Sequence, residues 1–254
     1  MQLEICIDSV ESAIAAELGG AQRVELCSDL LEGGITPSAG LIASVRRSVS
    51  IGLWVMIRPR GGDFCYTDRE FELMHEDIGH ASALGADGLV LGILNHQARV
   101  DVLRTRHLVE MAAPLPVTFH RAIDMTPDLS VALEDAISTG ATRILTSGGA
   151  KDAVSGMSDI ARMVGIAKER IAIMPGGGIT ADNIAAIADG TRASEFHASL
   201  RTAHPSPVAF RKQGIAMGTV EGREFERFMV REEDVRALLR ALERRAEHQA
   251  SNLI

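Results

Sequence analysis

The chain has 254 residues, of which 46% are hydrophobic and 24% charged, with a net charge of −8, as in a globular protein of one large or two small domains. The negative charge argues against a nucleic-acid-binding protein, and no apolar run approaches the ~20 residues of a membrane span. Three cysteines imply no disulfide framework, and the N-terminal stretch lacks the basic region of a signal peptide, so we expect a cytoplasmic protein.

Short apolar runs rich in Val and Ile recur along the chain, and helical patterns lie between them. The runs span residues 3–7, 23–27, 53–57, 88–93, 117–120, 143–146, 171–174 and 194–197. Alternating strand and helix predicts a parallel sheet, and eight such units in about 250 residues are typical of a (β/α)8 TIM barrel. We expect one α/β domain over residues 1–246 and a tail at 247–254. A doubly wound open sheet is the alternative, but several runs lack the continuous hydrophobicity that it needs.

Helix signals agree with this periodicity. Thr67 and Glu70 form the pattern of a capping box in front of a helix. The last helical pattern, residues 232–245, carries apolar side chains on one face, which we expect to pack on the barrel. Residues 200–231 show no clear periodicity. We expect an irregular insertion there, acting as a lid, an oligomer contact or a loop.

Polar side chains alternate with apolar ones in the first, second and last predicted strands. Outer positions of a barrel face the helices and should be apolar, so the polar side chains point into the barrel. These inward residues are Glu4, Cys6, Glu25, Cys27, Glu195 and His197. A buried carboxylate is costly unless it is paired or hydrated. The pattern therefore indicates a functional site, with an internal salt-bridge network as the alternative.

The third predicted strand ends in Arg58-Pro59-Arg60-Gly61-Gly62-Asp63. TIM barrels place their chemistry at this carboxyl end of the strands. The proline fixes the exit angle of the chain, and the glycines permit a sharp turn. We expect Arg58 to offset one of the inward glutamates, which leaves Arg60 free to hold an anion. A turn beside an internal salt bridge is the alternative.

Later strand ends carry further candidate residues. His120 points inward after the fifth strand, and its ordinary pKa near ~6.5 suits acid–base catalysis; a hydrogen-bonded structural histidine is the alternative. Ser147 follows the sixth strand, Gly176-Gly177-Gly178 follow the seventh, and Ser199 follows the eighth. Barrels often bind phosphate here with glycine amides and a helix N-terminus, and we expect Thr180 to cap that helix. Tight turns also need glycine, so the glycine run alone is a weak signal.

Seven segments together carry a family resemblance. They are IDSVESA (7–13), RVELCSDLLEGGITPS (23–38), MIRPRGGDF (56–64), PVTFHRAID (116–124), ILTSGG (144–149), IMPGGGIT (173–180) and EFHAS (195–199). This set resembles the CutC family of copper homeostasis proteins. The resemblance implies a (β/α)8 barrel, a cytoplasmic location, homodimers or homotetramers, and a role in handling Cu(I). The suggested metal ligands of the family match Cys6 and Cys27 here, whereas Cys65 stands where relatives usually carry another residue.

The chemistry of copper agrees with part of this resemblance. Cu(I) is soft and prefers thiolate and thioether ligands. Cys6 and Cys27 lie on neighbouring predicted strands with the same inward parity, so their sulfurs are expected to be close. The chain has no C-x-x-C motif and no Met-rich tract, and a buried free cysteine is also common as a small hydrophobe.

The alternative function is that of an uncharacterised barrel enzyme. Charged groups and glycine loops that converge on one barrel mouth suit acid–base chemistry on a small anionic or phosphorylated metabolite. The expected roles are Glu25 or Glu195 as base, His120 as acid with His197 at the same mouth, and Arg58 or Arg60 as anion anchor.

Overall fold

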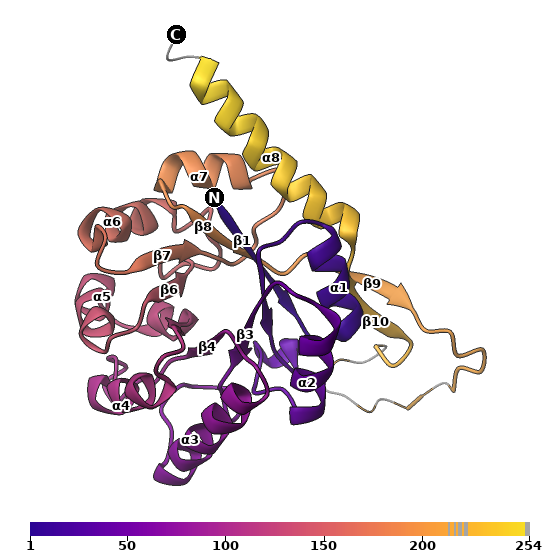
Figure 1. Cartoon of the computed structure of the whole chain (residues 1–254), viewed down its shortest axis with the longest axis horizontal. Helices are drawn as coiled ribbons and strands as arrows, with labels where there is room; N and C mark the ends of the chain where they lie inside the picture. The colour runs from indigo at the N-terminus through magenta and orange to yellow at the C-terminus, as the bar shows by residue number, and fades with distance from the viewer. Residues whose placement is uncertain (213, 216, 218–219, 221–222, 252–254) are drawn as a thin grey trace.

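Eight parallel strands form a nearly closed barrel, and helices that alternate with them in sequence surround it (Figure 1), so the predicted TIM barrel is confirmed. The structure is a computed structural model that describes residues 1–212, 214–215, 217, 220 and 223–251. The barrel strands are β1 (Gln2–Ile7), β2 (Arg23–Leu26), β3 (Gly52–Met56), β4 (Gly88–Leu91), β5 (Val117–Phe119), β6 (Arg143–Thr146), β7 (Ala172–Pro175) and β8 (Glu195–Ala198). The helices are α1 (Val10–Leu18), α2 (Ala39–Ser48), α3 (Asp68–Ala83), α4 (Val102–Ala112), α5 (Leu129–Ser138), α6 (Met157–Ala167), α7 (Ile184–Thr191) and α8 (Glu232–Ser251), with short 3-10 turns η1 (Leu30–Glu32) and η2 (Arg121–Met125).

The order of the strands and their register determine which side chains meet inside the barrel. Neighbouring strands pair in the order β7-β6-β5-β4-β3-β2-β1-β8, and a bridge between Gly176 and His197 joins the end of β7 to β8. Cys6 lies opposite Glu25, and Glu4 lies opposite His197. Because side chains alternate between the two faces of a strand, every second residue of each strand points into the barrel. The inward residues of neighbouring strands therefore meet in the interior.

The main core lies between the barrel and its helices. The outward side chains Leu3, Ile5 and Ile7 of β1 are fully buried, and they belong to one apolar cluster with Ala13 and Ala16 of α1. Burial of such side chains is the dominant favourable contribution to folding. At the start of α3, the predicted capping box is confirmed, because Thr67 and Glu70 each accept a hydrogen bond from the other's backbone N–H.

The segment before the last helix contains regular structure that the sequence analysis did not predict. β9 (Arg201–Pro205) and β10 (Glu226–Val230) pair in antiparallel fashion, and the hairpin projects from the side of the barrel near α1 (Figure 1). The expectation of an irregular insertion over residues 200–231 is thus corrected at both of its ends. The two strands were not visible in the sequence because most of their residues are exposed or half-buried, and they lack the apolar runs of the barrel strands.

α8 packs beside α7 and α1 and so completes the ring of helices around the barrel (Figure 1). Its apolar face packs on the barrel as predicted, with Val235, Leu238 and Leu242 buried in the main core. The helix continues to Ser251, so the described part of the expected tail is helical. None of the helices in the described part of the chain combines the length and the apolar character that a membrane span needs.

Candidate functional site

A cavity of about 310 Å³ opens at the carboxyl ends of the barrel strands. Five of the residues predicted from the sequence as site residues line it, and we call these the upper layer: Cys6, Glu25, Arg58, His120 and His197. All five are buried. The expected convergence of these groups on one barrel mouth is therefore present.

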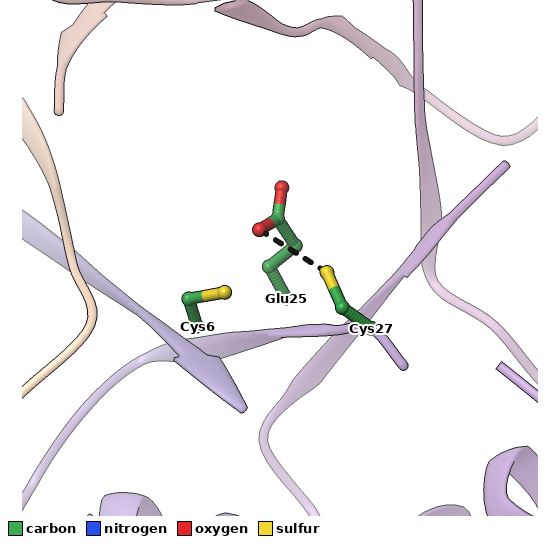
Figure 2. Close-up of side chains that lie close together, drawn as sticks. All are labelled: Cys6, Glu25 and Cys27. Carbon is green, nitrogen blue, oxygen red and sulfur yellow. Dashed lines mark hydrogen bonds between the residues drawn. The ribbon is translucent and has the colours of Figure 1, made fainter. Parts of the chain in front are cut away.

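The sulfur atoms of Cys6 and Cys27 lie close together near the carboxyl ends of β1 and β2. Cys6 comes from β1, and Cys27 follows the last residue of β2. Both sulfurs and a carboxylate oxygen of Glu25 lie within 4.8 Å of one another, and Figure 2 shows the three side chains converging on one point. The Cys27 thiol donates a hydrogen bond to Glu25 at 3.6 Å, and the thioether of Met56 packs in the same cluster. The group thus combines two thiols, a thioether and a carboxyl group.

The two thiols differ in their proton affinity. A hydrogen bond from Cys27 and another from His197 outweigh the effect of burial and lower the pKa of Cys6 to about 5. The same hydrogen bond to Cys6, together with burial, raises the pKa of Cys27 well above its ordinary value. Burial also raises the pKa of Glu25, with the charge of Cys6 adding to it. At neutral pH the group therefore presents one thiolate, which is the form of cysteine that binds metals.

His197 connects the sulfur pair to a buried carboxylate. Its Nδ1 atom lies 2.7 Å from Glu4 Oε1, and its Nε2 atom lies 3.7 Å from Glu25 Oε2. Burial by itself would lower the pKa of His197, but the Glu25 and Glu4 carboxylates and a hydrogen bond to Cys6 raise it well above the ordinary value. Hydrogen bonding to His197 and the charge of Arg23 overcome the effect of burial on Glu4 and lower its pKa to about 2.

A second set of charged side chains fills the barrel toward the amino ends of the strands. We call it the lower layer: Glu4, Arg23, Trp54, Arg143 and Glu195. Arg23 pairs with Glu4 at 2.6 Å and with Glu195 at 2.5 Å, and Arg143 also pairs with Glu195. Both guanidinium groups lie over the ring of Trp54, at 5.2 and 5.5 Å from its centroid. This layer is a network of buried, mutually paired charges.

The lower layer corrects the expected place of Glu195. Glu195 is the first residue of β8 and does not line the cavity. Inward side chains two residues apart on a strand are separated by about 6.6 Å along it, so Glu195 lies one layer below His197. With two arginine partners, it has the surroundings of a structural carboxylate.

The expected partners of Arg58 are also corrected. Within the described residues Arg58 forms no ion pair with Glu4, Glu25 or Glu195. Arg23 and Arg143 pair with Glu4 and Glu195 instead, and Glu25 lies beside His197. The guanidinium of Arg58 donates to three backbone carbonyls, those of Glu32, Gly34 and Gly62, at 2.8 to 2.9 Å. The cation also lies 4.8 Å from the ring centroid of Phe64.

His120 is buried beside the same phenyl ring. The centroids of the His120 and Phe64 rings are 5.0 Å apart. Burial, with a smaller contribution from the charge of Arg58, lowers the pKa of His120 to about 3, so the ring is neutral at physiological pH. Gly92 makes room for it, because a Cβ atom at that position would lie 2.5 Å from His120 Nδ1.

Arg60 is not free to hold an anion. It pairs with Glu70 at 2.6 Å and with Asp63 at 3.1 Å, and it donates to the carbonyls of Gly61, Asp63 and Cys65. Arg60 also lies outside the cavity lining. The expectation that Arg60 anchors an anion there is therefore wrong, because its own loop and the first turn of α3 neutralise it.

The predicted phosphate loop does not reach the cavity either. None of Ser147, Ser199 and the Gly176-Gly177-Gly178 run lines it. The Ser147 side chain is occupied by Arg121 and Asp124, and the Gly178 carbonyl accepts from the Asn183 side chain.

The helix after this loop also begins later than expected. α7 begins at Ile184 with Asn183 at its N-cap position. The backbone N–H of Thr180 donates to the Asn183 side chain, so Thr180 does not cap the helix.

Several residues of the lower layer and of the cavity lining were missed by sequence reasoning. Arg23, Trp54 and Met56 have the same inward parity as the predicted residues, so the alternation rule applied to every strand would have found them. Asp124 was harder to recognise from the sequence, because it lies after β5 in η2 and outside the alternating pattern of the strands. Its carboxylate accepts from the backbone N–H groups of Ser147 and Gly149, and thereby ties the loop after β6 to the loop after β5.

Comparisons of the sequence and of the structure with known proteins all find similarity to CutC proteins. The model of the CutC family matches residues 1–202. A mouse protein named copper homeostasis protein cutC homolog is 51% identical over 216 residues, which are 85% of this chain and 79% of the mouse protein. A Chromobacterium violaceum protein named as a CutC family protein is 46% identical over 242 residues, which are 95% and 98% of the two chains. The solved structure of the Streptococcus agalactiae CutC protein is similar with a TM-score of 0.75 and 35% identity, covering 78% of this chain and 98% of that one.

Proposed function

Because this chain belongs to the CutC family of copper homeostasis proteins, we propose that it binds Cu(I) inside its barrel, between Cys6 and Cys27. The observation that carries this proposal is the convergence of the two sulfurs and Glu25 within 4.8 Å. Two thiolate ligands suit a soft monovalent ion. Copper is then a cargo that the protein binds and releases.

The surroundings of the sulfur pair support Cu(I) over harder metal ions. A second group of potential ligand atoms comes from Glu4, Glu25 and His197, also within 4.8 Å of one another. Glu4 is already engaged by Arg23 and His197, so a metal ion there would have to displace strong hydrogen bonds. The sulfur pair has only weak sulfur hydrogen bonds to lose, and Met56 adds a thioether beside it.

The cavity offers Cu(I) a route to the sulfurs. Cys6 and Met56 both line it, whereas Cys27 lies behind them and is fully buried. The low pKa of Cys6, about 5, supplies a thiolate at the point where an incoming ion first meets a cysteine. Cys27 then loses its proton on binding, so we expect metal binding to release protons.

An anaerobic titration of Cu(I) against a chromogenic chelator tests the proposal. The wild type is expected to compete for one equivalent of Cu(I), and Cys6→Ser/Cys27→Ser is expected to lose that competition, because a hydroxyl is a poor ligand for a soft ion. Cys65→Ser is the matched control, since Cys65 lies in a different loop and is expected to leave binding unchanged. Equal binding by the wild type and the double variant would overturn the proposal.

We also propose that the protein acts in the cytoplasm and self-associates as a homodimer or homotetramer, as the family resemblance implies. All three cysteines are free, which suits a reducing compartment. Light scattering on the purified protein measures its mass in solution, and a monomer at all concentrations would count against self-association.

A further inference from the structure

Three residues of the cavity lining each have a buried polar atom without a hydrogen-bond partner among the described residues. These atoms are Glu25 Oε1, Arg58 Nε and His120 Nε2. A buried polar group without a partner is costly, and native structures contain few of them. Three such atoms around one cavity therefore indicate a polar occupant.

The histidine in this set is a hydrogen-bond donor. His120 Nδ1 accepts a hydrogen bond from the backbone N–H of Ala122 at 3.3 Å. In a neutral imidazole, the nitrogen that does not accept carries the proton. His120 Nε2 therefore carries a hydrogen, and this N–H has no acceptor within the described part of the chain.

The arginine in this set brings a charge that no carboxylate neutralises. Within the residues that the structure describes, Arg58 forms no ion pair, and the three hydrogen bonds from its guanidinium to backbone carbonyls do not involve Nε. Arg121, the other arginine of the cavity lining, is paired with Asp124 at 2.9 Å. The cavity wall thus carries a guanidinium without an ion pair among the described residues, next to the donor N–H of His120.

The rest of the wall is suited to a carbon skeleton. Phe64 contacts both donor residues through its ring, and the side chains of Met56, Met125 and Leu145 also line the cavity. A volume of about 310 Å³ is at the small end of ligand pockets. A single guanidinium without an ion pair, beside an apolar wall, matches a singly charged organic anion better than a phosphate dianion.

We propose that the cavity binds a small organic monocarboxylate, whose carboxylate accepts hydrogen bonds from His120 Nε2 and Arg58 Nε. Its carbon chain packs against Phe64 and Leu145. The ligand occupies the space above the sulfur pair, and its binding does not depend on copper. The inference goes beyond the proposed function, and either one can fail without the other.

The test uses the copper-free, reduced protein and defined probes. Propionate, isobutyrate and pyruvate are each titrated against the matching amide, and inorganic phosphate is included as a dianion. Thermal unfolding reports binding, and a long-range ¹H–¹⁵N spectrum follows the ring nitrogens of His120. At least one carboxylate is expected to raise the Tm and shift the His120 Nε2 resonance, whereas the amides and phosphate leave both unchanged.

Two variants separate ligand binding from folding. His120→Asn retains a side-chain oxygen to accept from Ala122 and removes the Nε2 donor, and it is expected to weaken carboxylate binding about tenfold or more. Arg58→Lys is the second variant, with the same direction expected, and Arg60→Lys, outside the cavity, is the control.

The inference is overturned by any of three results. The first is that no carboxylate shifts the Tm or the His120 signal at millimolar concentration. The second is that an amide or phosphate binds as well as the carboxylates. The third is that a folded His120→Asn protein binds carboxylates like the wild type.

Discussion

The lower and upper layers of the barrel interior arise from the same strands, yet they differ in how their charges are satisfied. Arg23 and Glu195 belong to the lower layer, and Glu25 and His197 lie two residues further along the same strands in the upper layer. In the lower layer the charges pair with one another at 2.5 to 2.6 Å. In the upper layer three buried polar atoms lack a partner within the described chain, whereas in the lower layer the uncharged Trp54 ring N–H lacks one and the charged groups do not remain unpaired.

We relate the paired charges of the lower layer to stability and the unpartnered groups of the upper layer to function. Buried charges that are mutually paired need no further partner, and removing one of them leaves the others uncompensated. Groups that remain unsatisfied around a cavity are costly to the folded protein, and they are retained where a ligand or metal ion completes them. The lower layer thus has the features of a structural network, and the upper layer is the candidate site.

The largest expected effect is the loss of stability in Arg23→Met. Arg23 is the common partner of Glu4 and Glu195, so its removal leaves two buried carboxylates with fewer partners. We expect the free energy of unfolding to fall by roughly 3–5 kcal/mol, as when one partner of a buried ion pair is removed. Urea unfolding measures the loss, and Arg170→Met, which breaks an exposed pair with Glu134, is the control. Equal effects of the two substitutions would contradict the structural role of the lower layer.

A smaller effect is expected from the titration of Glu195. Burial would raise the pKa of Glu195, but Arg143 and Arg23 outweigh it and hold the pKa below the ordinary value of 4.5. A carboxylate whose pKa is lowered by folding stabilises the native state above its ordinary pKa, and this contribution is lost as the pH falls through the folded-state pKa. Unfolding measured from pH 6 downward should therefore show a less steep acid decline in Glu195→Gln than in the wild type. Identical slopes would show that the two arginines do not hold Glu195 ionised.

The smallest effect is expected in the upper layer, for Glu25→Gln. Burial raises the pKa of Glu25 well above its ordinary value, and one of its oxygens has no partner in the described part of the chain. A neutral side chain of the same shape should change the free energy of unfolding by only about 1 kcal/mol or less. Glu4→Gln is the matched control in the lower layer, and it should cost clearly more, since Glu4 is ionised and paired. A larger loss for Glu25→Gln in urea unfolding would reverse the assignment of the layers.

The sequence predicted the barrel and much of the upper layer, since both depend on local patterns. The alternation of Glu4, Cys6, Glu25 and Cys27 with apolar residues has a period of two, and that period alone assigns side chains to the inside of a strand. The position of Arg58 at the end of the third strand likewise indicated the functional end of the barrel.

Several expectations failed where a residue had a nearby partner that local patterns do not reveal. Arg60 is held by Glu70 at the start of α3 and by Asp63 in its own loop. The glycine run after β7 turns the chain without reaching the cavity. In both cases the residue type was compatible with anion binding. Carboxylate partners decided against it for Arg60, and the position outside the cavity decided against it for the glycine run.

The sequence by itself determined the order of the elements and which residues of each strand point into the barrel. It also determined that two inward cysteines lie on adjacent strands. Only the tertiary structure decided which inward charges are paired and which have no partner among the described residues. Pairing depends on contacts such as Glu4 with His197 and Arg143 with Glu195, between residues 193 and 52 positions apart. Such contacts are fixed by barrel closure and strand register, because these bring the first strand beside the last, and no local period of the sequence contains that information.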